Sequence, residues 1–505
     1  MKKLSIFIYL FCLISYVCSG QEQVLQHTGQ QLRAKTDERI ELTGAVFRLA
    51  GIPEYKEGYI TEYNSDIDSC FSDFRFGELT AYIVRLRNEE KLGYGSVAAS
   101  ALCLKIEDGK VKIDDDINLS ERLGFGYGWK DEKTFRKYVR LLNDFYVKSD
   151  FHSFYENHRP LYEQAIAGMD DVLQYFNTEW FGEFFGIKRD MPNIYVAMGH
   201  GKSNYSVGDA NAIIIGGQVQ YSVEMLYPIV HETCHGYSNP MFLEYWPQMK
   251  EASEEMYPYV ADIIAQYGYD GAFTAMMEWL NDLFSLMYYR DNLQFIGERM
   301  VSLFALVDPD IKLNEDILKT MFITPKCNEM TERGFIWFPR SVQFMENFYL
   351  YRDIYPHINS FMPQLAAFVN DAARNYDRIK FEFEHRRPYI VNMFPANGSN
   401  IWEEKADEIR ITFSKPMSNG IYSTGRNFDD DELEILPLAE TDDENLSDCA
   451  YWADDRTYVL KIDRSSLEKD KKYGLRLHGA FFVASDYNRM EEDYWIIYNT
   501  NTKQK

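Results

Sequence analysis

Apolar residues recur every three or four positions over long parts of the chain, which is the spacing of one buried helix face. This pattern predicts helices within residues 120–186, 223–289 and 343–375. Short runs of apolar, partly β-branched residues at 193–198 and 212–215 are bounded by Gly and Asn, and they predict strands. We therefore expect a mainly helical module that contains a small mixed sheet.

The pattern changes in the last quarter of the chain. Apolar residues alternate with polar ones at 409–413, 458–462 and 473–477, and Gly and Pro punctuate this part of the sequence. Alternation with frequent turns predicts a β-sandwich. The chain is therefore predicted to be of the α+β class, with a helical module at residues 38–383 and an all-β sandwich at residues 388–505.

The first 20 residues have the composition of a signal peptide. Two lysines precede an apolar stretch over residues 4–17, and small residues follow it. We predict export to the periplasm or the exterior, with residues 21–37 as a polar leader. Lipid anchoring at Cys18 is the alternative, although Val17 stands where lipidation motifs have a small residue. No other stretch predicts a transmembrane segment.

The 505-residue chain carries a formal net charge of −25, and 16% of its residues are aromatic. Such an acidic surface repels phosphate backbones, so the prediction includes no nucleic-acid partner. Two of the seven cysteines lie in the signal peptide, and the other five are too scattered for a disulfide framework. These features favour a globular protein, and the aromatic content fits either large packed cores or a surface that contacts peptides or sugars.

The segment His231-Glu232-Thr-Cys-His235 carries the most specific chemistry. On a helix the two imidazoles lie one turn apart on one face, so they can share a zinc ion. Glu232 lies beside that face, where it can take the proton of a water molecule that zinc acidifies. We therefore predict His231 and His235 as zinc ligands and Glu232 as the catalytic base.

The residues around this motif predict how it is placed. Pro228 either opens the motif helix at its first turn or kinks a helix that begins near Ser222. Gly236 and the Ser-Asn-Pro run that ends at Pro240 predict that the helix stops just after the motif. The strand at 212–215 is expected to be the edge strand that precedes the motif helix.

A catalytic zinc needs a third protein ligand, and two glutamates are candidates. Glu278 lies in a stretch that is apolar nearly all round, where a carboxylate must find a compensating charge. Asp282, four residues later, shares its helix face and can orient a zinc-binding imidazole. Glu254 lies 19 positions after His235 but among other charged residues, and it is the alternative ligand. We favour Glu278.

Other polar residues receive less specific interpretations. Asn204 and Tyr205 can line a substrate cleft or simply form a loop. Tyr288 and Tyr289 can donate to an oxyanion, although ordinary packing is the better interpretation for both. The remaining candidates are expected to be structural or solvent-exposed, namely His200, His357 and the acidic runs 114–116 and 429–431.

These residues make the chain resemble the gluzincins, which are zinc peptidases with an HExxH helix and a glutamate ligand. It is similar to an uncharacterised exported family from Bacteroidetes over residues 38–378, through Arg39 to Gly51 and His231 to Pro240. The resemblance implies a zincin-like module that includes N-terminal strands, with Zn²⁺ as cofactor. Residues 393–417 resemble the opening of a bacterial Ig-like domain, which implies a spacer or docking module.

Two functions follow from this sequence. The first is an exported zinc metallopeptidase that hydrolyses protein or peptide substrates with Glu232 as the base. The second is a catalytically silent binding protein on a peptidase scaffold, whose partner is a cell-surface or host glycoprotein. The intact Glu232 favours the first function, because a binding protein does not need that carboxylate.

Overall fold

The structure is a computed structural model that describes residues 32–125, 128–267, 269–304, 318–419, 422–423, 433–439 and 449–501. The predicted signal peptide, its Cys18 and the acidic run 429–431 lie outside these ranges. Within them, no helix combines the length and the apolar composition that crossing a bilayer requires. The described residues form many helices and several small sheets, which agrees with the predicted α+β class.

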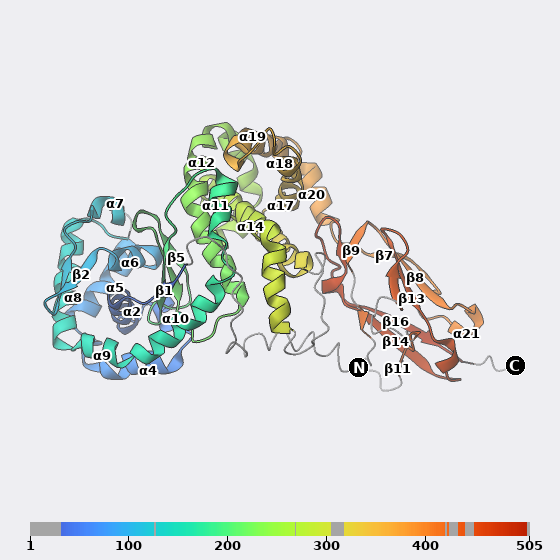
Figure 1. The fold of residues 1–505 in the computed structure, drawn as a ribbon, viewed down its shortest axis with the longest axis horizontal. Coiled ribbons are helices and arrows are strands. Elements are labelled where there is room, and N and C mark those ends of the chain that lie inside the picture. Colours follow the sequence, from blue (N-terminus) through green and yellow to red (C-terminus); the bar gives the residue numbers. More distant parts are fainter. Residues whose placement is uncertain are drawn as a thin grey trace.

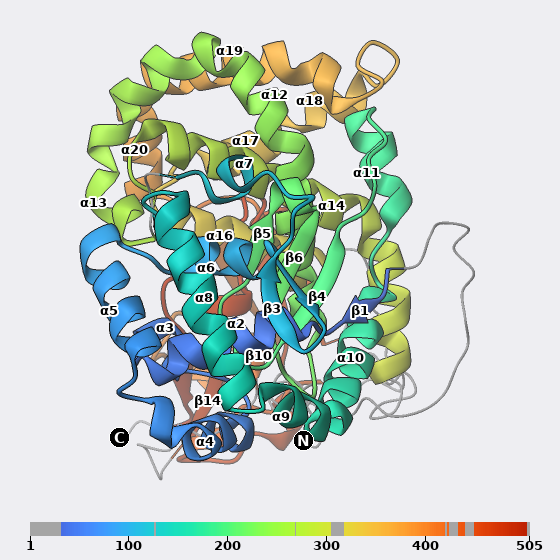
Figure 2. The same cartoon turned by 90° about the vertical axis from the view of Figure 1, so that its left-hand side faces the viewer.

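A four-stranded mixed sheet lies within the helical part (Figures 1 and 2). Its strands occur in the order β1, β4, β6, β5, with the bounds Ala34–Lys35, Asn193–Ala197, Ala212–Gly216 and Tyr205–Val207. The strands β1, β4 and β6 are parallel, and β5 runs antiparallel to β6. The strands predicted at 193–198 and 212–215 are thus β4 and β6, while β1 lies inside the predicted leader.

The strand at 212–215 is not the edge strand, contrary to the prediction. β6 lies between β4 and β5, and all of its residues are buried. A strand that is apolar on both faces must be covered on both faces, which is the environment of an interior strand. The edge strand beside β6 is β5, which has three residues and a partly polar sequence that gives little signal, and β1 forms the opposite edge.

The first residues of the family likeness do not form a strand, because residues 38–49 form the helix α2 (Glu38–Leu49), and the strands of the N-terminal part lie at residues 34–35, 104–107 and 110–113. The Asp37 side chain caps this helix by accepting a hydrogen bond from the backbone of Arg39. Every residue from Ile40 to Phe47 is buried, so the helix is enclosed by its neighbours and lacks the one-sided pattern of a surface helix.

The other elements before the motif are α3 (Pro53–Lys56), α4 (Thr61–Cys70), α5 (Glu78–Glu90), α6 (Tyr94–Ala101), β2 (Leu104–Glu107), β3 (Lys110–Ile113), α7 (Leu119–Leu123), α8 (Glu132–Lys148), α9 (Phe151–Asn157), α10 (Arg159–Leu173) and α11 (Thr178–Phe185).

Two long helices follow the sheet and carry the predicted site. α12 (Leu226–Met256) packs against α14 (Ala272–Phe304) and α19 (Ile358–Arg374), across the sheet from α2 (Figure 1). α12 begins at Leu226, so Pro228 lies in its first turn, as in the first predicted placement, and a 3-10 turn at Val223–Met225 leads directly into it from Ser222, as in the second. The shorter helices of this part are α13 (Ala261–Ile264), α16 (Thr324–Glu332), α17 (Phe338–Phe344), α18 (Glu346–Leu350) and α20 (Tyr376–Glu384).

The motif helix does not stop after the motif, contrary to the prediction. α12 has 31 residues and continues through Pro240 and Pro247. Pro240 removes one backbone donor, but the carbonyl left free is that of Gly236, an exposed residue where water can bind. Apolar residues directly after Pro240, including Met241 and Phe242, are buried against neighbouring helices. Their burial outweighs the missing hydrogen bond.

A separate all-β part with its own apolar core follows α20. One sheet has the order β12 (Ala450–Trp452), β13 (Thr457–Lys461), β8 (Glu408–Phe413) and β7 (Ile390–Phe394). The other contains β10 (Tyr422–Ser423), β14 (Lys472–Leu477), β11 (Leu433–Ile435) and β16 (Tyr494–Asn499). Two further strands pair with each other, β9 (Met417–Asn419) and β15 (Val483–Ala484), and the short helix is α21 (Ile401–Glu404).

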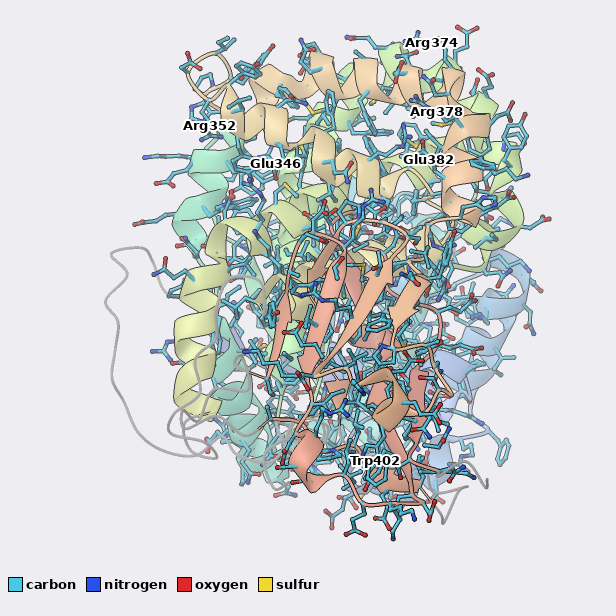
Figure 3. All side chains as sticks on the ribbon, turned by 90° about the vertical axis from the view of Figure 1, so that its right-hand side faces the viewer. Glu346, Arg352, Arg374, Arg378, Glu382 and Trp402 are labelled. Carbon is cyan, nitrogen blue, oxygen red and sulfur yellow. The ribbon has the colours of Figure 1, made fainter. Side chains whose placement is uncertain are left out.

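The two main sheets of this part bury side chains against each other. Ile411 and Leu460 come from one sheet, Leu475 and Ile496 come from the other, and all four belong to one core. Figure 3 views this part from its outer side and labels Trp402 of α21, the helix that Figure 1 shows at the end away from the helical part. The predicted β architecture is present, and the Ig-like assignment stays a prediction.

Candidate metal centre

The two histidines of the motif lie one turn apart in α12, and Glu278 of α14 faces both of them. His231 Nε2 is 3.4 Å from Glu278 Oε2, and His235 Nε2 is 3.6 Å from Glu278 Oε1. Ligand atoms from the three side chains all lie within 4.8 Å of one another. The structure therefore brings two helices together around one group of possible metal ligands.

The spacing of these atoms suits a small divalent cation. Nitrogen and oxygen ligands of a tetrahedral zinc site are about 3.3 Å apart, because each lies about 2.0–2.1 Å from the metal. The separations of 3.4 and 3.6 Å between carboxylate and imidazoles are close to that value. Two imidazoles and one carboxylate leave a fourth position for water or substrate. The cluster can hold a divalent metal ion with an open coordination position.

Each imidazole has an oxygen atom near its Nδ1, on the side away from the cluster. His231 Nδ1 is 3.2 Å from Asp282 Oδ1, and His235 Nδ1 is 3.1 Å from Asn239 Oδ1. An acceptor opposite Nδ1 favours the tautomer with the proton on that nitrogen. Once a metal replaces any proton on Nε2, that nitrogen can direct its lone pair to the metal beside Glu278.

Asp282 lies beneath the cluster and is fully buried. Tyr227 donates a 2.6 Å hydrogen bond to Asp282 Oδ1, and the Lys326 ammonium lies 3.4 Å from the same oxygen. Burial on its own raises the pKa of Asp282, but the charges of Lys326 and His231 outweigh it and hold that pKa well below its usual range. Asp282 is therefore an anion that can fix the orientation of His231.

The charges around the cluster also act on His231 and Glu232. Burial lowers the pKa of His231, but Asp282 and Glu278 outweigh burial and raise it to about 10. Without a metal, a protonated His231 supplies the positive charge that balances the carboxylates. A metal cation would supply that charge instead, and it must displace the proton from the imidazole in order to bind. Burial raises the pKa of Glu232 above its usual value, against the lowering effect of His231 and His235. A carboxylate with raised proton affinity suits the role of a general base.

Glu254, the alternative ligand, is not part of this cluster. Its side chain is exposed and lies 3.8 Å from Lys250, one turn earlier in α12. Because α12 is continuous, the spacing of 19 positions from His235 to Glu254 separates them by about 28 Å along the helix axis. Glu254 could reach the two histidines only if the helix ended after the motif and the chain turned back, and α12 does not end there.

Asn204 and Tyr205 hold the start of the edge strand β5. Asn204 Oδ1 accepts a 3.3 Å hydrogen bond from the backbone of Gly216 in β6. The Tyr205 ring packs against His200, with ring centroids 5.5 Å apart. These contacts are structural, and none of them involves the metal cluster.

The other residues considered have packing roles in the described part of the chain. Tyr288 donates to the carbonyl of Tyr175 and accepts from the backbone of Asn177, so it ties α14 to α11. The Tyr289 ring stacks on Tyr227 with centroids 5.6 Å apart. Further contacts link His357 to the carbonyl of Glu183, and Asp115 of the run 114–116 to Lys105.

Four residues around the cluster were not predicted from the sequence, namely Tyr227, Asn239, Asn281 and Lys326. Asn281 donates a 3.0 Å hydrogen bond to the carbonyl of His231, and its Oδ1 accepts one from Ser238. Tyr227 and Asn239 lie four residues from the two histidines, so helical spacing provides a signal for them. Lys326 belongs to α16, far along the chain, and no local pattern connects it with the motif.

His200 is buried in an aromatic environment, in line with its expected structural role. Its imidazole lies edge-on to Tyr55 and Tyr205, with centroids 5.1 and 5.5 Å away. Burial lowers the pKa of His200 to about 4. The folded protein therefore resists protonation of this side chain, which links its stability to pH.

We expect acid to destabilise the protein partly through His200. The pKa falls from 6.5 to about 4 on folding, so the unfolded state binds the proton first as the pH decreases. The contribution of this histidine is complete above pH 6.5 and is lost towards pH 4, which amounts to about 2 kcal/mol between pH 7 and pH 5. His200→Phe should remove this part of the pH dependence in urea unfolding measured at both pH values.

The exposed His385, which stacks on Phe381 at 4.2 Å, supplies the control. His385→Phe keeps an aromatic ring at the site and should leave the pH dependence of unfolding unchanged. An equal loss of stability between pH 7 and pH 5 in the wild type and in His200→Phe would show that His200 is not responsible.

Comparison with known proteins gave no match, since no family model, no curated protein and no solved structure corresponds to this chain. The cluster of His231, His235 and Glu278, with the residues around it, is the feature of the described chain from which a function can be inferred.

Proposed function

We propose that this protein is a zinc-dependent peptidase in which His231, His235 and Glu278 hold the metal and Glu232 is the general base. The observation that carries the proposal is the convergence of the three ligand atoms within 4.8 Å, beside the half-buried Glu232 of the helix that carries both histidines. Asp282 and Asn239 support it, because each faces the Nδ1 atom of one of the two imidazoles.

The residues of the cluster would have different roles in peptide hydrolysis. A bound Zn²⁺ would polarise the scissile carbonyl group and increase the acidity of a water molecule. Glu232 accepts the proton of the attacking water and then delivers it to the nitrogen of the leaving amine. Asp282 and Asn239 keep the imidazoles in place during these transfers. The substrate class is proteins or peptides.

The proposal includes the cellular setting expected from the sequence. Export through the segment 1–20 places the enzyme in the periplasm or outside the cell, with lipid anchoring at Cys18 as the alternative. The all-β part after α20 would then act as an Ig-like spacer or docking module. Its apolar core is separate from that of the helical part, which suits a module with its own role.

Metal analysis tests the proposed ligands directly. We expect the purified protein to contain close to one zinc ion per chain, measured by inductively coupled plasma mass spectrometry. His231→Ala and His235→Ala should each lose the metal, because two ligands rarely hold zinc in competition with a chelator. A wild-type protein that remains metal-free at neutral pH after incubation with zinc would contradict the proposal.

A further inference from the structure

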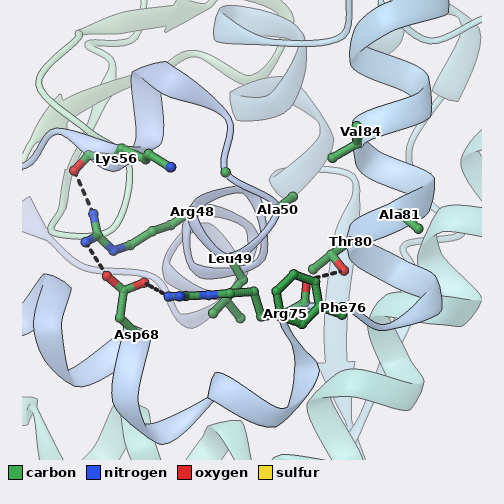
Figure 4. A pocket seen from close by; sticks show the side chains of 11 residues that line it. Arg48, Leu49, Ala50, Lys56, Asp68, Arg75, Phe76, Thr80, Ala81 and Val84 are labelled. Carbon is green, nitrogen blue, oxygen red and sulfur yellow. Dashed lines mark hydrogen bonds and ion pairs between the residues drawn. The ribbon is translucent and has the colours of Figure 1, made fainter.

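An open cavity of about 820 Å³ lies in the N-terminal helical part, apart from the metal cluster (Figure 4). The end of α2, the helix α4 and the first half of α5 enclose it. Apolar side chains form part of its wall, including Leu49, Ala50, Ala81 and Val84. Its volume is in the range of pockets that take small organic ligands.

The charged residues of this cavity are mainly basic. Arg48, Lys56 and Arg75 supply three positive charges, and Asp68 supplies the one negative charge among the lining residues. The chain as a whole has a net charge of −25, so a basic cavity departs from the rest of the molecule. A cavity with this local charge attracts anions.

The three basic residues differ in how many hydrogen bonds and ion pairs they make with the rest of the protein. Arg48 donates to the carbonyls of Asn64 and Lys56 and lies 2.6 Å from Asp68, so it holds α2 and α4 together. Arg75 contacts Asp68 through Nη2 alone, at 3.0 Å, and its side chain is partly exposed. Figure 4 shows Arg75 and Lys56 on either side of Arg48. Arg75 and Lys56 are therefore the cations that a ligand can reach.

Phe76 adds an apolar surface at the rim of the cavity. Its side chain is 94% exposed, the highest value among the large hydrophobic residues of the described chain. It follows Arg75 directly and lines the same cavity as Leu49 and Val84. A ligand with an apolar body can cover this ring and fill the cavity wall at the same time.

We propose that this cavity binds a small amphipathic carboxylate. Its apolar body would contact Phe76, Leu49 and Val84, and its carboxylate would pair with Arg75 or Lys56. One negative charge at the end of an apolar body matches a cavity that is apolar along its wall and basic at its rim. The site is separate from the metal cluster, so the proposal does not depend on peptidase activity.

Titration with 4-phenylbutyrate tests this proposal, with chemical shift changes or calorimetry as the readout. We expect saturable binding with a Kd on the order of 1 mM, typical of a weak site for a small ligand. 4-Phenylbutanol has the same apolar body without the charge, and 4-phenylbutylamine reverses the charge. Both should bind at least fivefold more weakly than the carboxylate.

Single substitutions locate the binding in this cavity. Phe76→Ser should weaken 4-phenylbutyrate at least fivefold, and Arg75→Gln should do the same while leaving 4-phenylbutanol unaffected. The control Arg85→Gln removes an exposed arginine that pairs with Glu89 elsewhere on α5, and it should change nothing. Absence of saturable binding, equal binding of the amine, or unchanged affinity in both Phe76→Ser and Arg75→Gln would overturn the proposal.

Discussion

Replacement of Glu232 by glutamine should leave the protein folded and able to bind zinc, but should lower peptidase activity on the order of 10²–10⁴-fold. The amide keeps the size of the side chain and removes its ability to accept a proton. Because Glu232 is not one of the three clustered ligands, the positions of His231, His235 and Glu278 should not depend on its charge. Cleavage of a peptide library by the two proteins measures the effect, with zinc content determined on the same samples.

The control for this substitution is Glu244→Gln, which changes an exposed carboxylate on the same helix. It should keep wild-type activity. If Glu232→Gln cleaves as fast as the wild type, the base is a different residue. If the wild type binds zinc but cleaves no peptide or protein, the binding-protein hypothesis replaces the peptidase.

Replacement of Glu278 should cause the largest loss of metal affinity among the carboxylates. Glu278→Gln removes the negative charge that faces both imidazoles at 3.4 and 3.6 Å. We expect zinc affinity to fall by more than the 10–100-fold that is typical when a residue behind a ligand is changed. Asp282→Asn should stay within that 10–100-fold range, because Asp282 acts through His231. Competition with a chelator of known affinity measures both variants.

Glu254→Gln is the matched control, since it removes a carboxylate that was the alternative ligand. Its exposed position beside Lys250 predicts a change in zinc affinity of less than about twofold. A loss of zinc in Glu254→Gln, together with unchanged affinity in Glu278→Gln, would reverse the assignment of the third ligand.

The sequence was informative where local spacing determines the geometry. The four-residue interval between His231 and His235 places both on one face of any helix, whatever the rest of the fold. The same interval relates Glu278 to Asp282, and the apolar residues around them indicated that their helix is enclosed. The structure brings these four residues together because α12 and α14 pack side by side.

The sequence was less informative where contacts between distant segments decide the outcome. The edge strand β5 is short, and its pairing with β6 through Tyr205 and Ile214 comes from the fold of the intervening loop. The continuation of α12 past Pro240 depends on burial of residues such as Phe242 by other helices. Lys326 reaches Asp282 from another helix for the same reason. The helix and strand propensities of individual residues do not predict contacts between distant segments.

The two prolines in α12 divide this helix into parts with different resistance to opening. Neither Pro240 nor Pro247 has an amide hydrogen, so the carbonyls of Gly236 and Leu243 lack their usual helical partners. The segment before Pro240 is joined to α14 through Asn281, whereas the segment after it contacts both the start of α14, through Phe242 and Phe273, and α19, where Asn370 donates to the carbonyl of Gln248. Amide hydrogen exchange along α12 should therefore be uneven, with the two ends opening as separate units. One continuous helix would thus open in two steps, with the proposed metal ligands in its first part.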